Sequence, residues 1–382
     1  MTPMSLTRKL RGLLAVACLL SSLAIPAVHA RPGDESESRL QVIGYVMDGK
    51  TLPSIDARKL DVINFAFAHV DAAHAVFLPG DTAPQALRQL AALKQDNPRL
   101  RIVLSIGGWG AGHFSEAAAT PAARARFAST AIALMRLHRL DGLDIDWEYP
   151  TLAGPGISHS PEDRDNFTAM LAEARGQLDT LAASTGGSYL LTIAAADGEA
   201  ARGLDLPRIA PLLDWINLMT YDFHGSLTPT TGHHAALWRS ATAADDGRTT
   251  ADAVEEFLAA GVPAAKINIG VAFYGRKFVG VQADNGGLHQ PYREHEAFLS
   301  WRDIRSRYLD RDGYVRHWDE RAQAPTLWNA AERAFITYDD PQSLRAKAHY
   351  VRARGLGGIM YWEHRQDDGT LLEALREGLY GP

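Results

Sequence analysis

Eight short runs of apolar, often β-branched residues recur along this chain, separated by longer stretches with helical patterns. The runs are Gln41–Met47, Asp61–Ala68, Arg101–Ile106, Leu140–Trp147, Tyr189–Ala195, Asp214–Tyr221, Lys266–Ala272 and Gly357–Trp362. Helices are predicted at Pro84–Gln95, Pro121–Arg139, Pro161–Ala183, Thr249–Ala260 and Pro341–Arg354. Several of them open with proline or with a Ser, Thr or Asp cap. Strands that alternate with helices form parallel sheets, and eight such repeats predict an α/β fold, a closed (β/α)8 TIM barrel.

One connection in this barrel is much longer than the others. About eighty residues separate the seventh predicted strand from the eighth. Structureless loops of that length are rare in compact domains, so Gly275–Ile336 is predicted to be a small inserted α+β subdomain. The barrel with its insertion then spans residues 40–382. No Gly-x-Gly-x-x-Gly follows the first predicted strand, which disfavours a dinucleotide-binding fold.

The N-terminus has the pattern of an export signal. A basic region with Arg8, Lys9 and Arg11 precedes the uncharged apolar run Leu13–Ile25, and Ala27-Val28-His29-Ala30 supplies a small-x-small cleavage site. We therefore predict a signal peptide at 1–30, a flexible lead-in at 31–39, and a secreted, extracellular or periplasmic protein. An uncleaved anchor is the alternative, but the apolar run is short for a membrane span.

Removal of residues 1–30 would change both the cysteine content and the charge. The single cysteine, Cys18, lies in that segment, so the mature chain would form no disulfide. It would keep 36 Lys and Arg against 45 Asp and Glu, a net charge of about −9. That charge disfavours a nucleic-acid partner. We expect a monomer with no cofactor and no membrane partner after cleavage.

The fourth predicted strand carries an unusual set of acidic residues. In a strand, side chains two residues apart point to the same face, so Asp144, Asp146 and Glu148 share one face. Like charges held this close raise at least one carboxyl pKa. A carboxyl group that stays protonated near neutral pH at a strand end can act as a general acid.

The other face of this strand distinguishes a functional site from a solvated edge strand with scattered acids. Leu143, Ile145 and Trp147 occupy it, and they are expected to be covered by the rest of the protein. A solvated edge strand would leave them exposed. The acids are therefore predicted to be functional.

Further groups gather where predicted strands end, which is where barrel enzymes place their active sites. Ser105–Trp109 follows the third strand, and its two glycines allow close approach of a ligand or a neighbouring backbone. Met219–Asp222 ends the sixth strand, with Met219 and Tyr221 on one face. The seventh strand runs into Phe273–Arg276, and the eighth ends in Met360–Glu363.

Aromatic rings beside carboxyl groups favour a carbohydrate ligand, because the apolar faces of sugars pack on aromatic rings. Trp109, Trp328 and Trp362 are the predicted platforms. The tryptophans assigned to structural packing are Trp215, Trp238, Trp301 and Trp318. The histidines after the sixth strand, His224, His233 and His234, lack the spacing and the acidic partners of a metal site and are interpreted as a polar loop.

These motifs resemble those of family 18 glycoside hydrolases, the chitinases and their relatives. The segment 141–148 matches the pattern DGxDxDWE completely, Ser105–Gly108 resembles the SxGG element, and Met219–Asp222 resembles MxYD. The segments 272–276 and 338–347 resemble the entry to and exit from the extra α+β insertion of the deep-cleft chitinases. The resemblance covers nearly the whole mature chain.

The resemblance implies roles for individual residues. Glu148 would be the acid/base, Asp146 would orient the substrate acetamido group, and Asp144 would share charge and a proton with Asp146. Tyr221 would bind the same acetamido group and complete the catalytic set. The residues expected to contact substrate are Trp109, Met219, Asp222, Tyr274, Arg276, Trp328 and Trp362.

The implied activity is cleavage of β-1,4 bonds in chitin or chitooligosaccharides by substrate-assisted, retaining catalysis, either endo or exo. One alternative is a non-catalytic chitin-binding lectin, although family members of that kind have lost the glutamate that Glu148 supplies here. Another is a hydrolase of a different N-acetylglucosaminide, such as peptidoglycan or a protein-linked N-glycan.

Overall fold

The structure, a computed structural model, describes residues 40–242 and 247–381. The segments predicted to be a signal peptide and a lead-in, 1–30 and 31–39, lie outside these residues. Within the described part of the chain, no helix combines the length and the apolar character needed to cross a bilayer.

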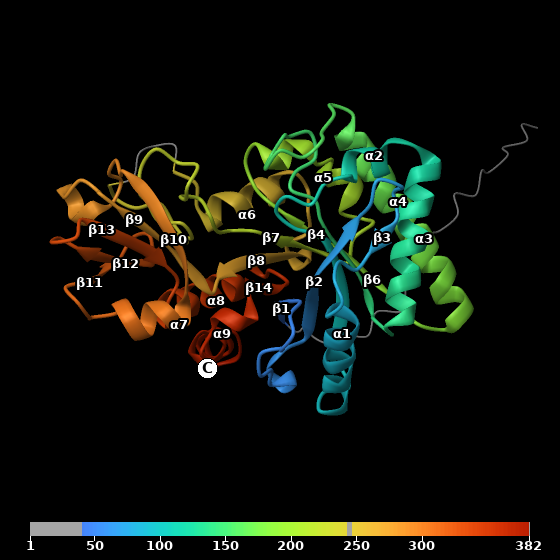
Figure 1. Ribbon diagram of the computed structural model, residues 1–382, viewed down its shortest axis with the longest axis horizontal. Helices are drawn as coiled ribbons and strands as arrows, with labels where there is room; N and C mark the ends of the chain where they lie inside the picture. Colours follow the sequence, from blue (N-terminus) through green and yellow to red (C-terminus); the bar gives the residue numbers. More distant parts are fainter. Residues whose placement is uncertain (1–39, 243–246, 382) are drawn as a thin grey trace, which may run out of the picture. The chain divides into compact units, whose positions relative to one another are not determined.

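Eight parallel strands close into a barrel, which confirms the predicted (β/α)8 architecture (Figure 1). The strand order is β1-β14-β8-β7-β6-β5-β4-β2, and pairing of β2 with β1 closes the ring. The strands are β1 (Gln41–Met47), β2 (Val62–Val70), β4 (Arg101–Gly107), β5 (Gly142–Asp146), β6 (Leu190–Ala195), β7 (Trp215–Leu218), β8 (Ile267–Ala272) and β14 (Gly358–Trp362). A short strand β3 (Val76–Phe77) pairs antiparallel with the end of β2. Each predicted strand overlaps an observed one, with ends that agree within three residues.

The predicted helices correspond to observed ones. They are α1 (Ala83–Ala92), α3 (Pro121–Leu137), α4 (Asp163–Thr185), α6 (Thr250–Ala259) and α8 (Pro341–Arg354). Thr120 and Thr249 cap α3 and α6 through their side chains, and Asp340 forms a capping box with Ser343 at α8. The sequence did not predict α2 (Phe114–Ala119), α5 (Leu206–Ile209) or α9 (Thr370–Tyr380). The first two are too short to show a helical period.

The apolar face of β5 is covered, as predicted. Leu143 and Ile145 are fully buried and Trp147 is 2% exposed. The Trp147 ring stacks on Phe114 with centroids 5.4 Å apart and meets the edge of Phe167 at 5.3 Å. These contacts anchor β5 to α2 and α4, so the carboxyl groups on its other face are held rigidly.

A second, antiparallel sheet is inserted between β8 and α8 and is drawn in orange in Figure 1. Its order is β10-β9-β13-β12-β11, with β9 (Tyr274–Val279), β10 (Glu294–Ser300), β11 (Val315–Asp319), β12 (Ala324–Asn329) and β13 (Ala334–Tyr338). A helical turn, α7 (Trp301–Asp303), continues as a π-helix over Ile304–Tyr308. The sheet begins two residues after β8, so its first strand rises directly from the barrel rim.

A fully buried ion pair ties the end of this sheet to the barrel. Lys347 Nζ lies 2.7 and 2.6 Å from the two carboxylate oxygens of Asp339, and both side chains are 0% exposed. Asp339 also accepts hydrogen bonds from Ser343 Oγ and from the backbone N–H of Ala272 at the end of β8. The contact therefore joins β13, α8 and β8.

Candidate active site

Strand β5 carries two carboxyl groups inside the barrel and leads to a third at its rim. Asp144 is 0% exposed and Asp146 4% exposed, whereas Glu148 lies two residues beyond the end of the strand and is only partly buried. Asp146 and Glu148 line the same cavity. The predicted grouping of acids on one face is therefore present for these two, with Asp144 deeper in the barrel.

Asp144 is held by four hydrogen-bond donors from four other strands. Tyr45 OH and Ser105 Oγ donate to Oδ2 at 2.8 and 2.7 Å, and Thr192 Oγ1 and Asn217 Nδ2 donate to Oδ1 at 2.6 and 3.3 Å. Burial raises the pKa of this carboxyl group, and the hydrogen bonds from Thr192, Ser105, Tyr45 and Asn217 oppose that rise. Each oxygen thus accepts two hydrogen bonds, and these bonds favour the ionised form of Asp144 against the effect of burial.

Asp146 lies two residues farther along β5, between Asp144 and the mouth of the barrel. Burial raises its pKa well above the usual range, and the negative charges of Glu148 and Asp144 raise it further. Among the described residues, its Oδ1 has no hydrogen-bond partner. A buried polar atom without a partner is expensive, so this oxygen is suited to a ligand that supplies an N–H or O–H group.

The Gly107–Gly108 pair makes the backbone position of Asp146 possible. Gly108 N–H donates to the carbonyl oxygen of Asp146 at 2.9 Å. A Cβ atom at Gly107 would lie 2.0 Å from that oxygen, and Gly107 has a φ of 126°. The close approach at Gly107 is therefore to a neighbouring backbone, whereas a Cβ atom at Gly108 would lie 2.7 Å from the ring of Phe67.

Glu148 has the pKa of a general acid. Burial raises it to about 7; a hydrogen bond with Tyr149 opposes the rise, and the charge of Asp222 adds to it. Repulsion among the three acids, expected from the sequence as the cause of the pKa shifts, is secondary, because burial is the largest cause for each of them. A carboxyl group with this pKa keeps its proton in mildly acidic solution and can deliver it to a leaving group.

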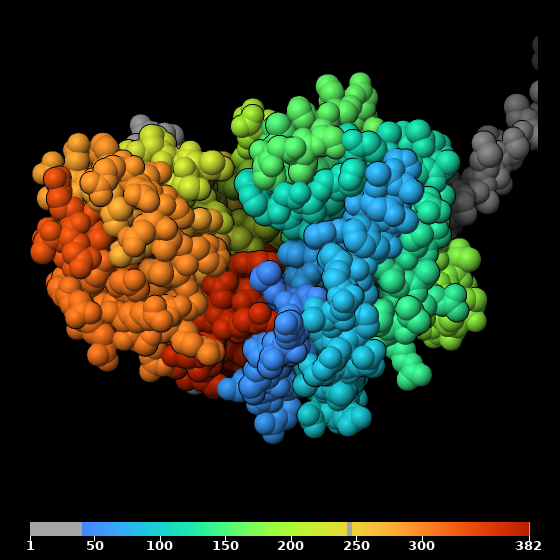
Figure 2. All heavy atoms as spheres, in the orientation of Figure 1, coloured from blue at the N-terminus to red at the C-terminus, as the bar shows by residue number. Residues whose placement is uncertain are grey.

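These acids face a cavity of about 790 Å³ at the C-terminal ends of the barrel strands. In Figure 2 the surface is hollowed where orange atoms of the inserted sheet face blue and green atoms of the barrel. Most of the predicted site residues line it, namely Trp109, Asp146, Glu148, Met219, Tyr221, Asp222, Tyr274, Arg276 and Trp362.

Aromatic rings form the barrel side of the cavity. Trp362 stacks on Phe67 with centroids 5.6 Å apart and an interplanar angle of 19°, and Tyr45 packs against it at 5.6 Å. Tyr45 and Phe67 were not among the residues predicted from the sequence. They stand at or near the C-terminal ends of β1 and β2, and the same strand-end rule that selected Trp362 would have found them.

The inserted sheet supplies the opposite wall. Phe298 on β10 lines the cavity, is 45% exposed, and stacks on Tyr274 with centroids 4.1 Å apart. Arg276 Nε and Nη2 each lie 2.7 Å from a carboxylate oxygen of Asp222. Burial alone would raise the pKa of Asp222, but His234 and Arg276 hold it well below its usual range. The sequence suggested neither this ion pair nor the contribution of Phe298.

Trp328 is the exception among the predicted sugar-binding residues. It lies on β12, is 8% exposed, and packs with Phe278, Val281 and Phe335 in the core of the inserted sheet. It does not line the cavity. The structure does not bring Trp328 to the other predicted site residues, because the strand register of the inserted sheet turns this ring inward.

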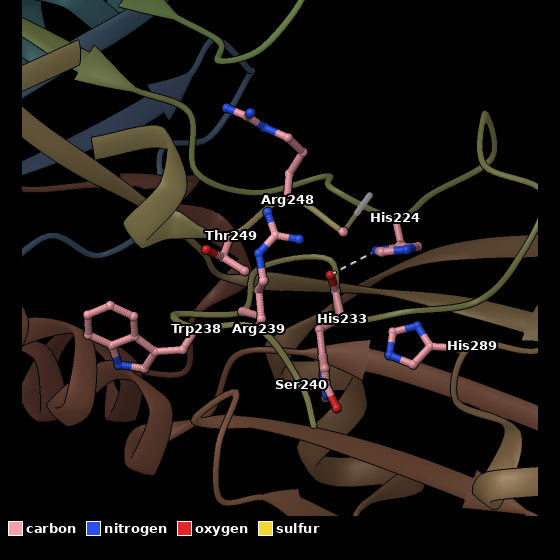
Figure 3. Close-up of a pocket in the computed structure, with 10 residues that line it drawn as sticks. His224, His233, Trp238, Arg239, Ser240, Arg248, Thr249 and His289 are labelled. Atoms are coloured by element: carbon pink, nitrogen blue, oxygen red, sulfur yellow. Dashed lines mark hydrogen bonds between the residues drawn. The ribbon is translucent and has the colours of Figure 1, made fainter. Parts of the chain in front are cut away.

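The histidines after β7 occupy two different environments. His224 and His233 lie beside His289 (Figure 3), with His224 Nδ1 3.2 Å from the carbonyl oxygen of His233. His234 is instead fully buried, with Nδ1 3.5 Å from Asp222 Oδ1. In residues 40–242 and 247–381, no group of three or more His, Cys, Asp or Glu side chains is arranged to hold a metal ion.

Comparison with known proteins adds a family assignment to this geometry. The model of the family described as glycosyl hydrolases family 18 matches residues 41–367. Chitinase A1 of Niallia circulans is 40% identical over 314 residues, which cover 77% of this chain and 45% of that protein. Chitinase B of Serratia marcescens is 34% identical, and the match covers 84% of this chain and 76% of that protein. This chain thus spans less than half of the length of Chitinase A1.

A solved structure matches this chain over a longer stretch than the two chitinases named above do. A glycoside hydrolase family 18 N-acetylglucosaminidase from Paenibacillus barengoltzii is 40% identical, with a TM-score of 0.85. The match covers 89% of this chain and 100% of that one. The likeness therefore includes both the barrel and the inserted sheet.

Proposed function

Because the chain belongs to glycosyl hydrolase family 18, we propose that it hydrolyses β-1,4 bonds between N-acetylglucosamine units of chitin with retention of configuration. The observation that carries this proposal is the pairing of Glu148, with a pKa of about 7, and the partnerless Oδ1 of buried Asp146 in one aromatic cavity. The first group can protonate a glycosidic oxygen, and the second can accept a hydrogen bond from an acetamido N–H.

In the proposed reaction the substrate's own acetamido oxygen attacks C1. The C1–O glycosidic bond breaks as Glu148 gives its proton to the leaving oxygen. Water then attacks C1, loses a proton to Glu148, and regenerates the acetamido group. Asp146 holds the acetamido N–H, and the negative charge of Asp144 beneath it stabilises the positive charge that develops. Two displacements at C1 retain the β configuration.

The cavity walls suit the rest of the sugar chain. Trp362, backed by Phe67, would support the apolar face of the ring whose C1 reacts, and Tyr221 would hold the acetamido oxygen in line. Trp109, 58% exposed at the rim, offers a platform for a neighbouring unit. Arg276 would contact sugars along the opposite wall.

The proposal is tested by following chitin oligomers by proton NMR in the first minutes of hydrolysis. Products should appear as β anomers, and fully deacetylated oligomers should remain intact because they lack the acetamido nucleophile. Initial formation of α anomers, or rapid cleavage of deacetylated chains, would overturn the mechanism. Tight binding of oligomers without turnover would instead support a lectin.

A second candidate is the removal of single N-acetylglucosamine units from chain ends. The likeness to the Paenibacillus barengoltzii N-acetylglucosaminidase, matched over that whole chain, favours it. A product time course on oligomers of several lengths separates the two activities. Monomer from the first time point indicates the exo activity, whereas early dimers and trimers indicate internal or processive cleavage.

We also propose that the protein is secreted, on the basis of the predicted signal peptide at 1–30. N-terminal sequencing of the protein recovered outside the expressing cell should begin at Arg31. Retention of the whole protein in the cell membrane fraction would favour the uncleaved anchor.

A further inference from the structure

A second concavity lies at the end of the barrel opposite the catalytic cavity. It has a volume of about 420 Å³. We call it the arginine groove, and its lining residues are Arg101, Arg136, Arg139, Leu140, Asp141, Gly187, Ser188 and Tyr189. Arg101 opens β4, and Asp141 and Tyr189 directly precede β5 and β6. Because each strand residue advances about 3.3 Å, β5 separates the groove from Asp146 by roughly 16 Å.

The chain segment that leads into this groove is basic, although the protein as a whole is acidic. The whole chain has 45 Asp and Glu against 39 Lys and Arg. Between Glu116 and Asp141, however, there is no acidic residue, and four arginines occur, Arg124, Arg126, Arg136 and Arg139. The last two line the groove.

The one carboxylate of the groove is already engaged. Asp141 Oδ2 accepts from Lys94 Nζ at 2.5 Å and from the backbone N–H of Ile102 at 2.6 Å, and Oδ1 lies 3.6 Å from Arg101 Nη1. No carboxylate of the described residues forms an ion pair with Arg136 or Arg139. The groove therefore has an excess of positive charge.

The backbone at Arg139 is a second, independent feature. Arg139 follows the C-cap of α3 with a φ of 56°, a left-handed conformation that glycine adopts with less strain. Cations near a helix C-terminus also interact favourably with the helix dipole, which accounts for Arg136 in the last turn of α3. The helix dipole does not explain why an arginine also occupies position 139, where the backbone is left-handed.

We propose that the arginine groove binds phosphate groups of a linear anionic polymer. Guanidinium groups match phosphate oxygens with paired, charge-assisted hydrogen bonds, and three arginines line this groove. The exposed Ser188 hydroxyl offers a further donor. The half-buried Tyr189 provides an apolar flank for the atoms that link one phosphate to the next. A polymer bound here leaves the catalytic cavity open, so it tethers the enzyme without blocking it.

The test measures binding of fluorescently labelled polyphosphate to the purified protein by anisotropy at about 50 and about 200 mM salt. R136E/R139E should weaken binding at the lower salt by about 10-fold or more and reduce the salt dependence. The matched control is R311E/R321E, which reverses the charge of two exposed arginines in the loops on either side of β11. It should bind nearly as tightly as the wild type, and both variants should hydrolyse a soluble chitin oligomer at the wild-type rate.

Several results would overturn the proposal. Equal weakening in the two double variants would mean that only overall charge matters. Unchanged binding in R136E/R139E would remove the groove from consideration. Binding to phosphatidylglycerol vesicles but not to polyphosphate would assign the surface to a membrane instead. If R136E/R139E does not fold, R136Q/R139Q, which removes the charges without reversing them, should still weaken polyphosphate binding several-fold.

Discussion

Replacing Asp222 by asparagine is expected to move the alkaline limb of the pH–rate profile to lower pH. Burial is the main reason that the pKa of Glu148 is raised to about 7, and the charge of Asp222 adds to that rise. Asp222 stays ionised because hydrogen bonds from His234 and Arg276 outweigh its burial and keep its pKa low. Without this negative charge Glu148 loses its proton more readily, so the acid catalyst is lost at lower pH.

The size of the effect follows from the titration of Glu148. With a pKa of about 7, the protonated fraction falls from about 90% at pH 6 to about 9% at pH 8, a roughly tenfold loss of kcat/KM. The side chain of Asp222 is 38% exposed, so its charge is screened by solvent. We therefore expect its removal to move the limb by about half a pH unit, equivalent to about 0.7 kcal/mol.

The assay is kcat/KM on a chitin tetramer between pH 4 and 9 at constant ionic strength. Asp222 is also expected to contact substrate, so its loss can lower kcat/KM at every pH. The pH at which kcat/KM falls to half its maximum is therefore compared, and the maximum itself is not. Asp165→Asn removes an exposed charge on α4 and serves as the control that should leave the limb in place. An unchanged limb in Asp222→Asn, or a wild-type limb below pH 6, would refute the reasoning.

Three further predictions test the site and the fold. Glu148→Gln should retain oligomer binding but lower turnover by about 10²–10⁴-fold or more, as stopped and continuous assays would show; near wild-type rates would remove Glu148 as the acid. A thiazoline analogue of the cyclised acetamido intermediate should inhibit competitively, and a sugar trapped covalently on Asp144 or Asp146 would contradict this. Lys347→Met should lower the free energy of unfolding by about 3–5 kcal/mol in urea titrations, because it leaves buried Asp339 without its cation; Lys347→Met/Asp339→Asn should recover part of the loss.

Local periodicity explains why the barrel could be predicted from the sequence. Strands and helices leave patterns with periods of two and 3.6 residues, and eight alternations of the two allow few architectures. The same local rule placed Asp144 and Asp146 on one face of β5 and Trp147 on the other. These relations hold within one strand, so they do not depend on how distant segments pack.

Contacts between residues that are far apart in the sequence could not be predicted from local periodicity. Tyr45 lies 99 residues from Asp144 in the chain, and closure of the barrel brings its hydroxyl group to 2.8 Å from the carboxylate. The ion pair of Asp222 and Arg276 spans 54 residues and joins the barrel to the inserted sheet. The cause of the carboxyl pKa shifts also belongs here, because burial is a property of the folded molecule.

Trp328 shows most clearly what the tertiary structure decided. As a tryptophan in the insertion it had the right chemistry for a sugar platform, whereas Phe298 attracted no attention in the sequence. In the folded sheet, β12 is an inner strand with Trp328 turned into the core, and β10 is an edge strand with Phe298 facing the cavity. A shift of one residue in strand register exchanges the two faces of a strand. Residue type thus determined which side chains are able to bind sugar, and strand order and register determined which of them reach it.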